Sequence, residues 1–166
     1  MRPAAVLFLT LYILRALVGE ANSMLSGLHV WLFAGGLFVT YAALAMPFRP
    51  GFAASLLGGL LCDALSPVAF GTHAALFAAA HAVVYNARER LQRDETGVRV
   101  AVAAIVNAAL FVAMSFLALR STHGAASWPR MISDLAWSEA AVAALAPWFF
   151  SLQLRTLELA RALPER

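Results

Sequence analysis

Long apolar runs alternate with short polar stretches along most of the chain. A helix needs about 20 apolar residues to cross the hydrocarbon core of a membrane. The clearest runs of this kind are 28–46 and 100–119. A third run, 132–154, is apolar after two acidic residues in its first two turns, and a shorter run, 3–18, contains one arginine. These four runs predict membrane-spanning helices.

One further apolar region is interrupted by Pro67 and Gly71. Proline lacks a backbone donor and disfavours helix at the residue before it. The region therefore predicts two short helices, 51–65 and 71–85, joined by a tight turn. With the four other runs, the pattern predicts an all-α integral membrane protein: a six-transmembrane-helix bundle that forms one domain over 1–166.

Composition supports a membrane protein. The chain has 166 residues, of which 62% are hydrophobic and 13% are charged, and its mean hydropathy is +0.77. A soluble domain is about half apolar and about a quarter charged. The length leaves no room for a separate soluble domain. The single cysteine, Cys62, excludes an internal disulfide and a multi-cysteine metal site.

All the basic residues are arginines, and their positions predict the topology. With the N-terminus inside, the cytoplasmic arginines are Arg2, Arg49, Arg88, Arg90, Arg93, Arg99, Arg155, Arg161 and Arg166, and the outer ones are Arg120 and Arg130. This bias obeys the positive-inside rule and predicts two cytoplasmic termini. The arginines form no basic patch interleaved with aromatic residues, which argues against nucleic-acid binding. We expect 3–18 to be retained rather than cleaved as a signal peptide, because Arg15 interrupts its apolar run.

Several polar groups fall inside the predicted spans, where burial is costly and partners are needed. They are Arg15, Asp63, His73, His81, Asn107 and Glu139. Asp63 ends a row at four-residue spacing that also contains Gly51, Ser55 and Gly59. Such small-residue rows mark contacts between helices rather than with lipid. On the next helix, a second row with the same spacing consists of His73, Phe77, His81 and Tyr85. Asn107 is interpreted as interhelical hydrogen-bond glue.

Asp63 is predicted to form a buried pair with His73 or with Arg15, although Arg15 could instead extend toward the outer interface. Three roles stay open for Asp63: a structural pair or cap at the hairpin, part of a pocket for a small ligand or partner segment, and a proton-relay carboxylate. The structural role is favoured over the pocket role, and the proton-relay role is the least favoured because no second carboxylate except the distant Glu139 shares the depth of Asp63. His73 and His81 are two turns apart, which suits interior packing better than shared ligation of one metal.

The residues around Asp63 also resemble a known family motif. Gly51-Phe52, the string GLLCDALS over 59–66, and GTHAA over 71–75 are similar to the central motif of MreD, a bacterial rod-shape-determining membrane protein family. This chain has Pro67 where that family usually has glycine. By position, the resemblance implies that Gly59, Asp63, Ser66 and Gly71 shape the hairpin and any central cavity.

The resemblance implies a non-enzymatic subunit of the cell-elongation machinery in the bacterial inner membrane, without cofactors. Its expected direct partner is the single-span protein MreC. The glycosyltransferase RodA, its partner transpeptidase and the actin-like protein MreB are expected in the same complex, in which the chain could also self-associate. The family further resembles the fold of the S-components of energy-coupling-factor transporters.

A vitamin-binding S-component is the alternative function. Such subunits tend to carry an Ala-xxx-Ala contact in their first helix, and this chain has none there: Ala4, Ala5 and Ala16 are followed four residues later by larger side chains. A membrane enzyme is a third class, but no catalytic motif is recognisable. The hydrophilic loop 86–99 either docks a cytoplasmic partner or is a solvated loop whose arginines set orientation.

Overall fold

The computed structural model describes the chain except for residues 1, 29, 67–68, 92–94, 122–127 and 163–166. Helices account for almost all of the described residues, and none of these residues lies in a strand. In chain order the elements are α1 (Arg2–Leu25), η1 (Ser26–Leu28), α2 (Gly35–Ala45), α3 (Phe48–Ala64), α4 (Thr72–Ala87), η2 (Arg88–Arg90), α5 (Thr96–Ser121) and α6 (Trp128–Ala162). The predicted all-α class is confirmed.

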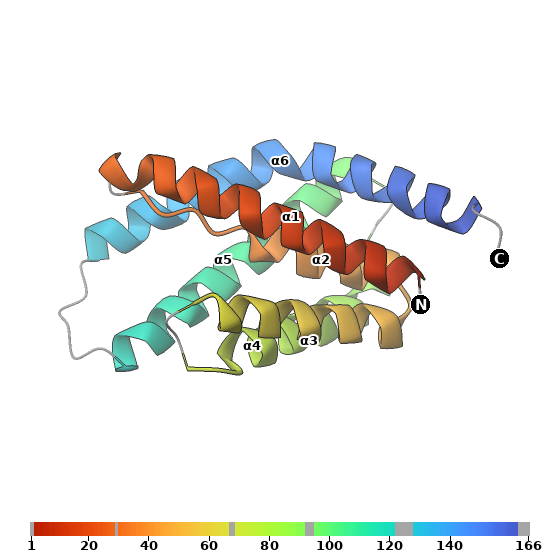
Figure 1. Cartoon of the computed structure of the whole chain (residues 1–166), viewed down its shortest axis with the longest axis horizontal. Helices are drawn as coiled ribbons and strands as arrows, with labels where there is room; N and C mark the ends of the chain where they lie inside the picture. The colour runs from red at the N-terminus through yellow and green to blue at the C-terminus, as the bar shows by residue number, and fades with distance from the viewer. Residues whose placement is uncertain (1, 29, 67–68, 92–94, 122–127, 163–166) are drawn as a thin grey trace.

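Successive α-helices run in alternate directions along the long axis of the molecule, and α1 begins at the end where α6 finishes (Figure 1). The helices α3 and α4 form an antiparallel hairpin with the most extensive packing in the fold. At the centre lies α2, which contacts α3, α4, α5 and α6. Its residues from Gly36 to Leu44 are all buried. A helix that is apolar on every side belongs in the core.

The prediction of a helix over 28–46 was wrong for residues 30–34. Regular α-helix begins only at Gly35, and residues 30–34 have no regular secondary structure. Five residues of extended chain cover about 16 Å, and the 11 residues of α2 cover about 16 Å. The two pieces together match the roughly 30 Å hydrocarbon thickness. Hydropathy alone therefore could not distinguish this arrangement from one continuous helix.

The other predicted segments correspond to helices with shifted ends. The largest differences are at α1, which continues past residue 18 to Leu25, and at α6, which continues past residue 154 to Ala162. Apolar runs define only the part of a helix that suits lipid, whereas backbone hydrogen bonding continues into polar flanks. The predicted break between 51–65 and 71–85 is present. Pro67 itself lies outside the described residues.

Two helical segments within the described residues are long and apolar enough to cross a membrane, Thr96–Leu119 and Trp128–Thr156. The apolar helix Gly35–Ala45 is shorter. With 17 and 16 residues, α3 and α4 also fall short of the about 20 residues of a full crossing. A bundle with six membrane crossings therefore stays a prediction, as does its likeness to S-components.

Candidate functional site

The most concentrated polar arrangement lies where α3 meets α4. Asp63, next to the end of α3, is only 4% exposed. Its Oδ1 accepts a hydrogen bond from the backbone N–H of His73 at 2.8 Å. Its Oδ2 accepts from the N–H groups of Gly71 at 3.0 Å and Ala74 at 3.1 Å. The first N–H groups of a helix lack intrahelical partners and favour a nearby negative charge. Asp63 therefore caps α4 from the preceding helix.

The His73 side chain completes this cap. Its Nδ1 lies 2.8 Å from Asp63 Oδ1, within both hydrogen-bond and salt-bridge distance. Of the two pairs that the sequence left open, the structure forms the one with His73. Arg15 makes no hydrogen bond or ion pair to any other described residue. Four N–H donors thus converge on one carboxylate, an arrangement that suits a structural anchor.

Two glycines allow this hairpin geometry. Gly71, the N-cap of α4, has a left-handed φ of 96°, which side-chain-bearing residues rarely adopt. At Gly59, an added Cβ would lie 2.4 Å from the Cα of Ala74. The backbones of α3 and α4 are therefore in direct contact, as the small-residue row predicts. Ser66, just beyond α3, donates its N–H to the Asp63 carbonyl at 3.3 Å.

His81 lies apart from the Asp63 cap and is fully buried. Ser55 Oγ is 3.2 Å from its Nδ1, and the rings of Phe52 and Tyr85 pack around it. Its Nε2 has no hydrogen-bond partner among the described residues. Nor do those residues contain a group of three His, Cys, Asp or Glu side chains that could hold a metal. The two histidines thus occupy separate environments.

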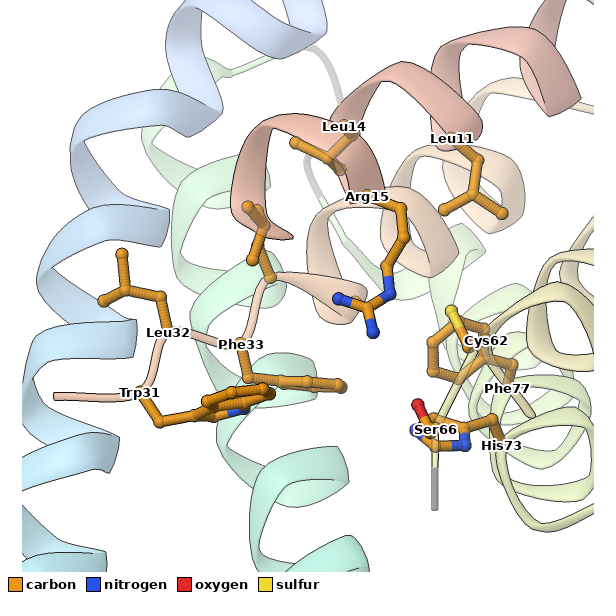
Figure 2. Close-up of a pocket in the computed structure, with 13 residues that line it drawn as sticks. Leu11, Leu14, Arg15, Trp31, Leu32, Phe33, Cys62, Ser66, His73 and Phe77 are labelled. Carbon is orange, nitrogen blue, oxygen red and sulfur yellow. The ribbon is translucent and has the colours of Figure 1, made fainter. Parts of the chain in front are cut away.

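A cavity of about 80 Å³ lies beside the hairpin. Its walls come from α1, from the extended segment before α2, and from the adjoining ends of α3 and α4. Figure 2 shows the Arg15 guanidinium extending from α1 into this space, with Trp31 and Phe33 on one side and Cys62, Ser66, His73 and Phe77 on the other. Arg15, Ser66 and His73 therefore share one pocket, while His81 does not line it.

The extended segment that forms one wall is tied down by side chains from three helices. Asn22 on α1 accepts the Leu32 N–H at 2.7 Å and donates to the Leu32 carbonyl at 2.9 Å. On α6, Asp134 Oδ1 and Ser138 Oγ accept the N–H groups of Trp31 and Phe33, each at 3.0 Å. Backbone donors that are buried away from water need such partners.

Asn107 on α5 completes these attachments. It accepts the Gly36 N–H at 3.1 Å and donates to the Phe33 carbonyl and to Glu139 Oε1, both at 3.0 Å. An added Cβ at Gly36 would lie 2.5 Å from the Asn107 Cα. Asn107 therefore links α5 to other elements by hydrogen bonds, as interpreted from the sequence. Two of its three bonds go to backbone groups, those of Gly36 and Phe33, and one goes to a side chain on α6.

Sequence reasoning missed the roles of Asn22, Asp134 and Ser138. A signal was available, because Asp134 and Ser138 are four residues apart and so share one helix face. What the sequence lacked was any indication that these polar groups face backbone rather than one another.

An all-helical fold with two segments long and apolar enough to cross a membrane suits a helical membrane protein. Residues 4–155 match the family described as rod shape-determining protein MreD. The match covers most of the 166 residues, so the chain belongs to the MreD family, and the resemblance inferred from the motif is confirmed. No curated protein and no solved structure matches the chain significantly.

Proposed function

We propose that this chain is a non-enzymatic subunit of the bacterial rod complex, which binds MreC directly and supports regulation of the peptidoglycan synthases RodA and its partner transpeptidase. MreB is an indirect partner that belongs to the same complex. The observation that carries this proposal is the family match over residues 4–155. MreD proteins are rod-shape-determining membrane proteins, and this membership supports the proposed partners.

The arrangement of arginines supports a multi-pass protein in the inner membrane with both termini in the cytoplasm. Arg49 at the start of α3 and Arg88 at the end of α4 belong to the end of the bundle where the chain begins (Figure 1). Arg99 at the start of α5 and Arg155 in the later part of α6 belong to the same end. Arg130, at the start of α6, belongs to the opposite end. This clustering is what the positive-inside rule requires.

The engaged state of the buried polar groups supports a non-enzymatic role. The Asp63 carboxylate is occupied by donors of α4, and Asn107 and Glu139 are bonded to each other. General acid–base catalysis needs a group free to exchange a proton with a substrate. The described part of the chain presents no pair of carboxylates arranged for that purpose.

The outward faces of the long helices offer surface for lipid and for a partner helix. On α6, Leu145, Trp148 and Leu152 are exposed, with Trp148 81% exposed. In water such an apolar face would be unusual. In a membrane it is expected, and single-span partners bind to faces of this kind.

The decisive experiment is affinity purification of the full chain from membranes of its native host, with identification of the proteins recovered. We expect MreC and the wall synthases, and we expect depletion of the chain to round rod-shaped cells. Recovery of an ATPase module together with a bound vitamin would overturn the proposal.

The substitution Asp63→Asn tests the role of the hairpin in this assembly. The amide keeps the size and one acceptor but removes the charge that orders the first turn of α4. We expect a folded protein that recovers less MreC in the same purification. Glu89→Gln removes an exposed charge from η2 and is the matched control, with recovery unchanged. If Asp63→Asn is neutral for expression, assembly and cell shape, Asp63 has no role in partner binding.

A further inference from the structure

Arg15 carries a charge that no described residue neutralises. Its guanidinium extends into the cavity between α1 and the α3–α4 hairpin (Figure 2). Among the described residues it forms no hydrogen bond or ion pair, and it is half-buried. Arginine stays protonated at any physiological pH. A cation placed inside an apolar bundle is costly and marks a functional site when it has no internal partner.

The acidic side chain of the adjoining hairpin, Asp63, does not serve as that partner. Asp63 belongs to the same hairpin, but both its oxygens are already bonded to His73, Gly71 and Ala74. Turning the carboxylate toward Arg15 would leave the first turn of α4 without its cap. The Asp63 carboxylate is thus bonded to the backbone of the hairpin, and the Arg15 guanidinium stays available to a ligand.

The remaining walls of the cavity are mostly apolar and aromatic. Leu11 and Leu14 come from α1, and Trp31, Phe33 and Phe77 supply three rings. The ring-bearing segment is held by bonds from Asn22, Asp134, Ser138 and Asn107. The pocket wall is therefore ordered before any ligand arrives, which lowers the entropy lost on binding.

The size of the cavity limits what fits. A volume of about 80 Å³ corresponds to roughly two or three water molecules, which suits a phosphate or carboxylate group but no larger body. Trp31 lines the cavity and is half-exposed, so it stands at the mouth. An attached apolar chain would leave past this ring.

We propose that this pocket binds the anionic group, a phosphate or carboxylate, of a membrane amphiphile, with Arg15 as the charge partner and Trp31 beside the start of the apolar chain. The pocket lies at a depth that the predicted topology assigns to the outer half of the membrane, where lipids reach it directly. A soluble anion could offer the same head chemistry without the chain, and the two sources are separable by experiment. The inference does not depend on MreC binding.

The test uses the full chain in neutral maltoside micelles, with its unfolding temperature measured against three additives. These are dodecyl phosphate, inorganic phosphate, and dodecanol as the uncharged chain. We expect dodecyl phosphate to raise the unfolding temperature by several degrees, and the other two to have little effect. Arg15→Gln should weaken the apparent affinity for dodecyl phosphate at least about tenfold, the loss typical of one charge-assisted contact.

Matched variants keep the outcome interpretable. Arg49→Gln removes an exposed arginine at the other end of the bundle, and its response should equal that of the unmodified protein. Arg15→Lys keeps the charge, and its response should lie between those of the unmodified protein and Arg15→Gln. If Arg15→Gln fails to fold, Cys62→Met fills the pocket without touching charge and should also abolish the response. An equal response in the unmodified protein and Arg15→Gln overturns the proposal. Inorganic phosphate acting as strongly as dodecyl phosphate overturns the amphiphile assignment.

Discussion

Two places in the described part of this protein use side chains to satisfy backbone N–H groups that have no helical partner, and they do so in opposite ways. At the α3–α4 hairpin a single carboxylate, Asp63, receives three backbone N–H groups and a histidine ring nitrogen. At the extended segment before α2, the donors of Trp31, Leu32 and Phe33 are taken by separate side chains on α6 and α1. At the hairpin the acceptors belong to one residue that is close in sequence. At the extended segment they belong to several residues, and those on α6 are distant in sequence.

The difference shows how each region depends on the rest of the fold. The partners at the hairpin are 8 to 11 residues apart in the chain, so the cap forms as soon as α3 and α4 meet. The partners of the extended segment on α6 are more than 100 residues away. That segment acquires its conformation only after the whole bundle has assembled.

The largest expected effect is at the hairpin, because one substitution there removes four hydrogen bonds. Asp63→Ala should lower the free energy of unfolding by about 3 to 5 kcal/mol, since buried donors lose a charged acceptor. Unfolding in mixed micelles of maltoside and dodecyl sulfate measures this change. Glu89→Ala, at an exposed position in η2, should stay within about 0.5 kcal/mol. Equal stability of the two variants would show that Asp63 does not anchor the hairpin.

A smaller effect on the free energy of unfolding is expected at the extended segment, because several side chains share its hydrogen bonds. Asn107→Ala removes the bonds to Gly36, Phe33 and Glu139, while Asn22, Asp134 and Ser138 still hold the segment. At the modest value of interhelical hydrogen bonds in membranes, we expect a loss of about 2 kcal/mol in the same assay. Asn86→Ala, at an exposed position near the end of α4, is the control. A loss of unfolding free energy as large as that of Asp63→Ala would show that Asn107 alone holds the segment.

A third effect is expected from adding single methyl groups at the two backbone contacts. Gly59→Ala and Gly36→Ala would each place a Cβ within 2.5 Å of a neighbouring Cα. Because the atoms met are mostly backbone rather than the end of a flexible side chain, the helices themselves must shift, at a cost of about 3 kcal/mol. Gly97→Ala meets no atom within 4 Å and should be neutral or slightly stabilising. Both contact variants matching Gly97→Ala would mean that close backbone approach is unimportant in this bundle.

Much of the hairpin could be predicted from sequence. The small-residue row that ends at Asp63 indicated a helix–helix face, and Pro67 and Gly71 indicated a break. The pairing of Asp63 with His73 was one of two options, and choosing between them required the position of α1. The extended segment could not be predicted, because hydropathy over 28–46 suits a continuous helix equally well.

The sequence by itself determined the helical class, the membrane character, the family motif and the residues of the hairpin, because apolar periodicity and short-range spacing are local properties. Only the tertiary structure decided that residues 30–34 are not helical, that Asp63 caps α4, and that Arg15 faces a pocket in which no described residue bonds to it. The physical reason is the same in each case. A buried polar group is defined by what lies opposite it, and the groups opposite Trp31 and Phe33 come from a helix more than 100 residues away.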